Sequence, residues 1–111
     1  MIRILVLESE TRLRHAFKTM LESAGYEVDI ALDGADARSR HSRRPADLVI
    51  ADGSQGGEEF SGARILAVPG GGDPVSGAGV THFLPKPFGR DDLLAAVRVS
   101  LGGQPPIPSV L

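Results

Sequence analysis

Short continuous apolar runs recur along this chain, and they constrain its fold more than any other feature of the sequence. Residues 4–7, 48–51 and 65–68 consist of apolar side chains only. Such runs are typical of strands that are buried on both faces of a parallel sheet. Residues 27–30 alternate polar and apolar side chains, which favours a strand nearer the sheet edge, and residues 80–84 complete a set of five predicted strands.

Helices are predicted between some of these strands. Apolar residues recur at helical spacing over 11–23, and Gly25 stands where a helix C-cap is expected. A second helix, capped by Asp33 and ended by Pro45, carries few large apolar residues, so we expect thin packing. The pattern over 91–101 predicts a last helix, which the following glycines end.

The alternation of strands with helices or loops predicts an α/β fold with a doubly wound, five-stranded parallel sheet. Residues 53–62 lack an apolar helical face, and residues 69–79 contain five glycines and two prolines. We therefore expect the helices at these two places, the third and fourth of a complete fold of this type, to be shortened or missing. Residues 1–103 are expected to form the domain, and residues 104–111 a flexible tail or the start of a linker.

The composition is that of an ordinary globular domain. Hydrophobic residues make up 41% of the 111 residues, charged residues 23%, and there is no cysteine, which excludes disulfide frameworks and thiolate metal sites. The first apolar run is too short for a signal peptide, and no window reaches the roughly 20 apolar residues of a membrane span. We expect a cytoplasmic protein with no membrane partner.

Charge gives little reason to expect nucleic acid as a direct partner. The net charge is −2, although one local group of arginines falls on the second predicted helix. No aromatic residue interleaves this group to stack on bases, so we interpret it as a solvated helix face. Its members are Arg38, Arg40, Arg43 and Arg44.

Three stretches carry a resemblance to a known family. They are ILVLESE over 4–10, PADLVIAD over 45–52 and FLPKPF over 83–88, together with GYEV at the start of the second strand. In this order they resemble the acidic turn, the phosphoacceptor strand and the lysine-proline turn of response regulator receiver domains. The resemblance spans about residues 2–101, with a poor match over 53–79. It implies the flavodoxin-like strand order and a signalling domain, not an enzyme.

The resemblance also implies roles for individual residues. Asp52 would be the phosphoacceptor nucleophile, and Lys86 the positive partner of the phosphoryl group. Mg²⁺ would be held by Glu8, Asp52 and the backbone carbonyl of Ser54, with Glu10 as a further candidate ligand. A phosphoryl group and an attacking carboxylate are both negative, so this chemistry needs a hard cation and a fixed ammonium.

The sequence departs from the family pattern at two of its functional positions. The family has two adjacent acids in the first turn, and the second of them binds the metal directly, whereas this chain has Glu8 followed by Ser9. We therefore expect Mg²⁺ to bind weakly. The hydroxyl residue that the family places after the fourth strand aligns with Pro69, which has no donor. Phe83 takes the position of the aromatic switch residue, so the switch has lost its hydroxyl partner.

Three interpretations follow. In the first, the chain is a two-component receiver domain that takes a phosphoryl group on Asp52 from a histidine kinase or phosphotransferase. In the second, it is a pseudo-receiver that docks a constitutive protein partner without phosphate, as Ser9 and Pro69 suggest. The third, a small enzyme or nucleotide binder on the same fold, is poorly supported because no phosphate-binding glycine motif follows the first strand.

Overall fold

The computed structural model describes residues 1–8, 10–52, 64–68, 80–84 and 88–102. Five parallel strands form one sheet in the order β2-β1-β3-β4-β5, which is the flavodoxin-like order expected from the sequence. The strands are β1 (Arg3–Leu7), β2 (Glu27–Ala31), β3 (Leu48–Asp52), β4 (Arg64–Val68) and β5 (Val80–Phe83). The fold class and the edge position of the alternating strand are confirmed.

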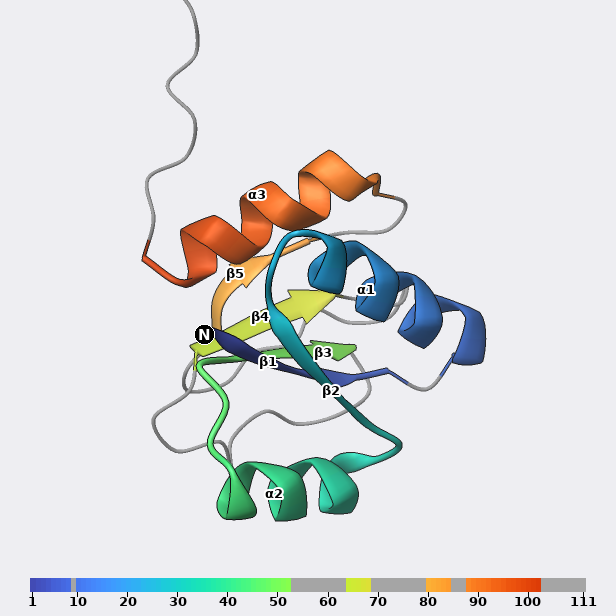
Figure 1. Cartoon of the computed structure of the whole chain (residues 1–111), viewed down its shortest axis with the longest axis vertical. Coiled ribbons are helices and arrows are strands. Elements are labelled where there is room, and N and C mark those ends of the chain that lie inside the picture. The colour runs from blue at the N-terminus through green and yellow to red at the C-terminus, as the bar shows by residue number, and fades with distance from the viewer. Residues whose placement is uncertain (9, 53–63, 69–79, 85–87, 103–111) are drawn as a thin grey trace, which may run out of the picture.

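Three helices occur within the described residues: α1 (Thr11–Ser23), α2 (Gly34–Arg43) and α3 (Arg90–Ser100). Figure 1 shows α1 and α3 on one face of the sheet and α2 on the other. The segments expected to have shortened or missing helices lie outside the described residues, as does the expected tail over 104–111. No helix in the described part of the chain is long and apolar enough to cross a membrane.

The sheet separates two hydrophobic clusters, because successive side chains of a strand point to opposite faces. The larger cluster lies beneath α1 and α3 and includes Phe17, Leu21, Leu93 and Val97. The smaller one lies beneath α2, which contributes Ala37. Apart from Ala37, the only residue that α2 buries is His41, so its packing is thin, as the sequence predicts.

Local sequence signals fix the ends of the helices. Asp33 caps α2, with its carboxylate accepting a hydrogen bond from the backbone N–H of Asp36 at 2.8 Å. Gly25 follows α1 with a φ of +93°, a left-handed conformation that favours glycine. The turn after α2 is held by His41, whose Nδ1 accepts a hydrogen bond from the backbone N–H of Ala46 at 3.0 Å. His41 therefore has a packing role.

Candidate functional site

Two acidic positions come together at the carboxyl edge of the sheet. Leu7 of β1 is the register partner of Ala51 of β3, so Glu8 and Asp52 stand one position further along two neighbouring parallel strands. Neighbouring strands lie about 4.8 Å apart. Asp52 is the last residue of β3, and its register partner in β4 is Val68. This edge is where open parallel α/β sheets carry their ligands and chemistry.

Glu8 is buried, although it carries an acidic side chain. Only 2% of its surface is exposed. Its Oε2 accepts a hydrogen bond from the backbone N–H of Glu10 at 3.1 Å, which folds the turn back over the carboxylate. Burial of an acid is costly unless hydrogen bonds or a cation compensate for lost water. The carboxylate of Glu8 is therefore a candidate ligand for a cation at this edge of the sheet.

Glu10 has a different place from Glu8. It occupies the N-cap position of α1 with an extended backbone, and its side chain is exposed and does not cap the helix. Its main chain shapes the turn: the N–H binds Glu8, and the carbonyl accepts from the N–H of Arg14 at 2.9 Å. The role of Glu10 as a metal ligand stays a prediction.

Arg14 is a neighbour of the site that the sequence interpretation missed. Its Nη1 donates to the backbone carbonyl of Glu8 at 3.1 Å, and its Nη2 donates to the hydroxyl of Thr11 at 3.1 Å. These bonds tie the acidic turn to the first turns of α1. An arginine one helical turn after the N-cap is the signal that could have drawn attention to it.

The remaining predicted site residues are described only in part. The structure places Asp52 and Phe83 at the ends of β3 and β5, and Phe83 is the register partner of Ala67 in β4. Ser54, Pro69 and Lys86 lie outside the described residues, so their predicted roles stay predictions. In the sequence Lys86 follows the last residue of β5 by three positions.

The donor set at this edge suits magnesium, although it is sparse. Glu8 and Asp52 are oxygen ligands of the kind that Mg²⁺ takes from proteins. Ser9 stands where a second acid would complete the turn. Within the described ranges no group of three or more His, Asp or Glu residues is placed to hold a metal ion. These residues fit a weak Mg²⁺ site that depends on water for several ligands.

No family model matches the chain. Among curated proteins it is similar to the response regulator MprA of Mycobacterium tuberculosis strain H37Rv, with 31% identity over 116 aligned residues. It is also 28% identical over 116 residues to MprA of Mycobacterium sp. strain KMS. Each alignment covers 90% of this chain and 50% of the relative, so the chain spans about half the length of these relatives.

Solved structures of receiver proteins are also similar to this chain. The chemotaxis protein CheY4 of Vibrio cholerae superposes with a TM-score of 0.77 and 23% identity, over 90% of this chain and 98% of that one. The receiver domain of the hybrid histidine kinase CckA gives a TM-score of 0.71 and 28% identity, over 89% and 98% of the two chains. The sequence relatives and the structural neighbours together support a response regulator receiver domain.

Proposed function

We propose that the chain accepts a phosphoryl group on Asp52 from the phosphohistidine of a histidine kinase or phosphotransferase. The observation that carries the proposal is the buried Glu8, which follows the last residue of β1 beside the position where Asp52 ends β3. A carboxylate at the ligand edge of a parallel sheet is placed where a bound cation would lie beside Asp52. The domain would thus be a signalling element, not an enzyme.

The proposed transfer is a direct displacement. A carboxylate oxygen of Asp52 attacks phosphorus, the O–P bond forms, and the P–N bond to the donor histidine breaks. The donor imidazole keeps the electron pair of that bond and takes up a proton. Lys86 would balance charge on the phosphoryl oxygens, and Glu8 would hold Mg²⁺ beside Asp52. When bound, Mg²⁺ supplies neutralisation of the negative charge that the two reactants bring together.

The proposed partners follow from the same chemistry. The comparisons include response regulators and the receiver domain of a hybrid histidine kinase, which supports a kinase or phosphotransferase as the donor. A receiver that works without phosphate remains the competing function, because Ser9 and Pro69 remove a metal ligand and a hydroxyl donor from the family pattern. One experiment separates the two.

The test is intact mass after incubation with Mg²⁺ and a small-molecule phosphodonor such as acetyl phosphate. The wild type should gain one phosphoryl group, and Asp52→Asn should gain none. Glu8→Gln should slow the gain by about tenfold or more, since it removes the charged ligand. Glu22→Gln is the matched control, because Glu22 is an exposed acid that pairs with Lys18 on α1.

Two results would count against the proposal. If folded wild type gains no phosphoryl group at any Mg²⁺ concentration, the chain works without phosphate, and the search turns to a constitutive protein partner. If Asp52→Asn is labelled as fast as the wild type, the phosphoacceptor is another residue. A circular dichroism melt of each variant checks that the protein is folded.

A further inference from the structure

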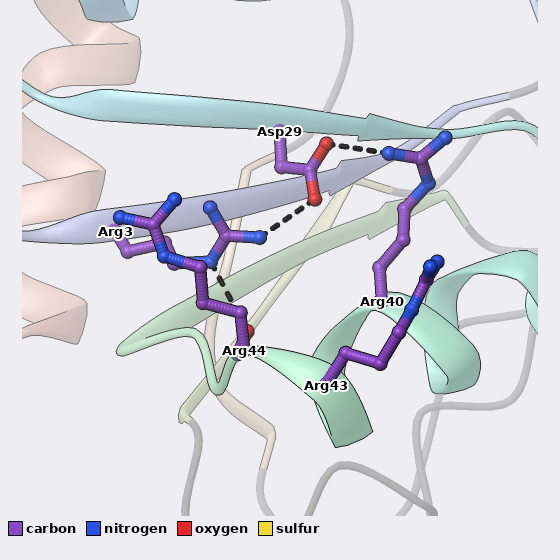
Figure 2. A pocket seen from close by; sticks show the side chains of 5 residues that line it. All are labelled: Arg3, Asp29, Arg40, Arg43 and Arg44. Carbon is purple, nitrogen blue, oxygen red and sulfur yellow. Dashed lines mark hydrogen bonds and ion pairs between the residues drawn. The ribbon is translucent and has the colours of Figure 1, made fainter.

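A second charged region lies away from the carboxyl edge, in an open pocket of about 370 Å³. It lies on the α2 side of the sheet, where β1 begins and α2 ends, whereas Glu8 and Asp52 stand at the opposite ends of their strands. Figure 2 shows four arginines and one aspartate around it. The lining residues are Arg3, Asp29, Arg40, Arg43 and Arg44.

Asp29 of the edge strand β2 fixes two of the arginines. Its Oδ2 accepts from Nη2 of Arg3 at 2.7 Å, and its Oδ1 accepts from Nη1 of Arg40 at 2.8 Å. Both carboxylate oxygens are therefore engaged, and the Asp29 side chain is only 20% exposed. Arg3, at 12% exposure, is the more deeply buried of the two guanidinium groups. Asp29 and the two arginines that it binds together form the base of the pocket.

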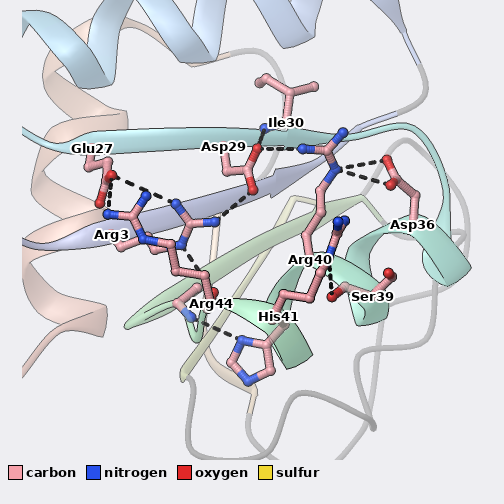
Figure 3. A network of polar contacts seen from close by, with 11 residues as sticks. Arg3, Glu27, Asp29, Ile30, Asp36, Ser39, Arg40, His41 and Arg44 are labelled. Atoms are coloured by element: carbon pink, nitrogen blue, oxygen red, sulfur yellow. Dashed lines mark hydrogen bonds and ion pairs between the residues drawn. The ribbon is translucent and has the colours of Figure 1, made fainter.

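Arg40 is held from a second side by Asp36, one helical turn earlier on α2 (Figure 3). The Nε of Arg40 donates to Oδ1 of Asp36 at 3.0 Å. This hydrogen bond, together with the charge of Asp29, raises the pKa of Arg40. The two carboxylates therefore fix the orientation of the guanidinium, which as in any arginine is charged.

The other two arginines, Arg43 and Arg44, are exposed. Nη2 of Arg44 pairs with Oε1 of Glu27 at 2.6 Å, with 65% of the Arg44 side chain exposed. Arg43 donates from Nε to the backbone carbonyl of Ser39 at 3.4 Å. Among the residues that the structure describes, no carboxylate forms an ion pair with Arg43, and Figure 2 shows no contact between it and the other residues drawn. Its two terminal nitrogens can therefore take an incoming ligand.

We propose that this pocket binds an acidic segment of a partner protein, in which one Asp or Glu side chain meets the fork of Arg43 and a neighbouring one approaches Arg44, whose Nη2 already pairs with Glu27. Guanidinium groups bind carboxylates through two parallel hydrogen bonds, a geometry that arginine provides and lysine does not. Arg3, Arg40 and Arg44 are balanced by the carboxylates of Asp29, Asp36 and Glu27, so the net positive charge of this contact comes from Arg43. Arginine is also enriched at protein interfaces.

The chemistry of the lining argues against other anionic occupants. The described residues that line the pocket are all Arg or Asp, so none of them offers an aromatic ring on which a nucleic acid base could stack. None of these described lining residues has an apolar side chain that could form a wall for the body of a small phosphorylated molecule or enter a membrane. The net charge of −2 means that the chain as a whole does not attract acidic peptides, so any binding must be local.

The test is fluorescence anisotropy at low ionic strength with a labelled peptide that contains four consecutive Glu residues. The same peptide with Gln in their place controls for charge. Arg43→Glu should weaken binding of the Glu peptide by about tenfold or more. The matched control is Arg98→Glu, an exposed arginine on α3 with the same change in net charge, which should weaken it by less than about twofold. Arg43→Ala, with a smaller loss, serves if the charge reversal disturbs folding.

The outcomes are decisive in both directions. A loss confined to the Arg43 variants supports the proposal, whereas equal losses for Arg43→Glu and Arg98→Glu would show general charge attraction and overturn it. Equal binding of the Glu and Gln peptides overturns it too. If single-stranded RNA or anionic vesicles bind more tightly than the peptide with the same dependence on Arg43, the proposed occupant is wrong. Asp52→Asn should leave peptide binding unchanged, so the peptide assay tests this proposal independently of the proposed phosphorylation of Asp52.

Discussion

The aromatic contact between Phe17 and Phe88 connects the core to the predicted phosphate-binding turn. The two ring centroids lie 5.6 Å apart, with 25° between the ring planes. Phe17 belongs to α1 and is fully buried, while Phe88 is partly buried and packs against the same cluster. Lys86 precedes Phe88 by two positions in the sequence. We therefore expect Phe88 to anchor the chain that carries this lysine.

Phe88→Ala should lower the free energy of unfolding by about 2 kcal/mol. Removal of a fully buried Phe side chain costs about 3–5 kcal/mol. Phe88 is only partly buried, which reduces this cost to about half of that, and the figure includes the stacking on Phe17. Phe88→Leu keeps most of the apolar contact and should cost about 1 kcal/mol. A domain with stability of about 5–15 kcal/mol remains folded after either change.

Urea unfolding followed by circular dichroism measures this prediction. With a urea dependence of about 1–2 kcal/mol/M, the Phe88→Ala midpoint should fall by roughly 1–2 M. Leu32→Ala is the control, because Leu32 is 63% exposed and should change the midpoint little. The rate of phosphoryl transfer from acetyl phosphate to the folded variant should also fall. A Phe88→Ala cost below about 0.5 kcal/mol would refute the anchoring argument.

Three further predictions concern stability. A hydrogen bond from the backbone N–H of Leu32, with the charge of Arg40, lowers the pKa of Asp36 from its ordinary value of 3.8. The ionised Asp36 should therefore stabilise the fold fully above pH 3.8, and this stabilisation should be lost as the pH falls through the lower folded-state pKa. The urea midpoints of the wild type and Asp36→Asn should accordingly converge in acid. Gly25→Ala should lower the free energy of unfolding by about 1–2 kcal/mol, because alanine is strained in the left-handed backbone conformation of this position. Gly89→Ala, where φ is negative, should lower it much less, and thermal melts of the two variants measure the difference. Ser100→Ala should leave the melting temperature unchanged or higher, because within the described chain its buried hydroxyl lacks a hydrogen-bond partner.

The sheet was predictable because burial leaves a direct mark on the sequence. The apolar runs located β1 and β3, and the alternation over 27–30 placed β2 at an edge, where one side of the strand pairs with β1 alone. The errors are of one or two residues at element ends. Asp52, for example, was expected to follow β3 and is its last residue, because a backbone register with β4 is not encoded in side-chain polarity.

The ion-pair network was not predictable, because it depends on residues far apart in sequence. The arginines of α2 were interpreted as a solvated face, which holds for the exposed Arg43 but not for Arg40. Arg40 is half-buried, and its partner Asp29 also binds Arg3, at the other end of the network. Local helical spacing carries no information on such a contact. The bond from Arg14 to the carbonyl of Glu8 was missed for the same reason.

The two charged regions share one element, since Arg3 begins β1 and Glu8 follows its last residue. Five residues of rise separate them by about 17 Å. The Debye length is about 8 Å at physiological ionic strength, so charge added at Asp52 should barely change the potential at the arginine pocket. Residues 4–7 between them are fully buried, which fixes both ends to one rigid strand. If phosphorylation nevertheless alters peptide binding, the coupling must come from a conformational change, because direct charge interaction is too weak to produce it.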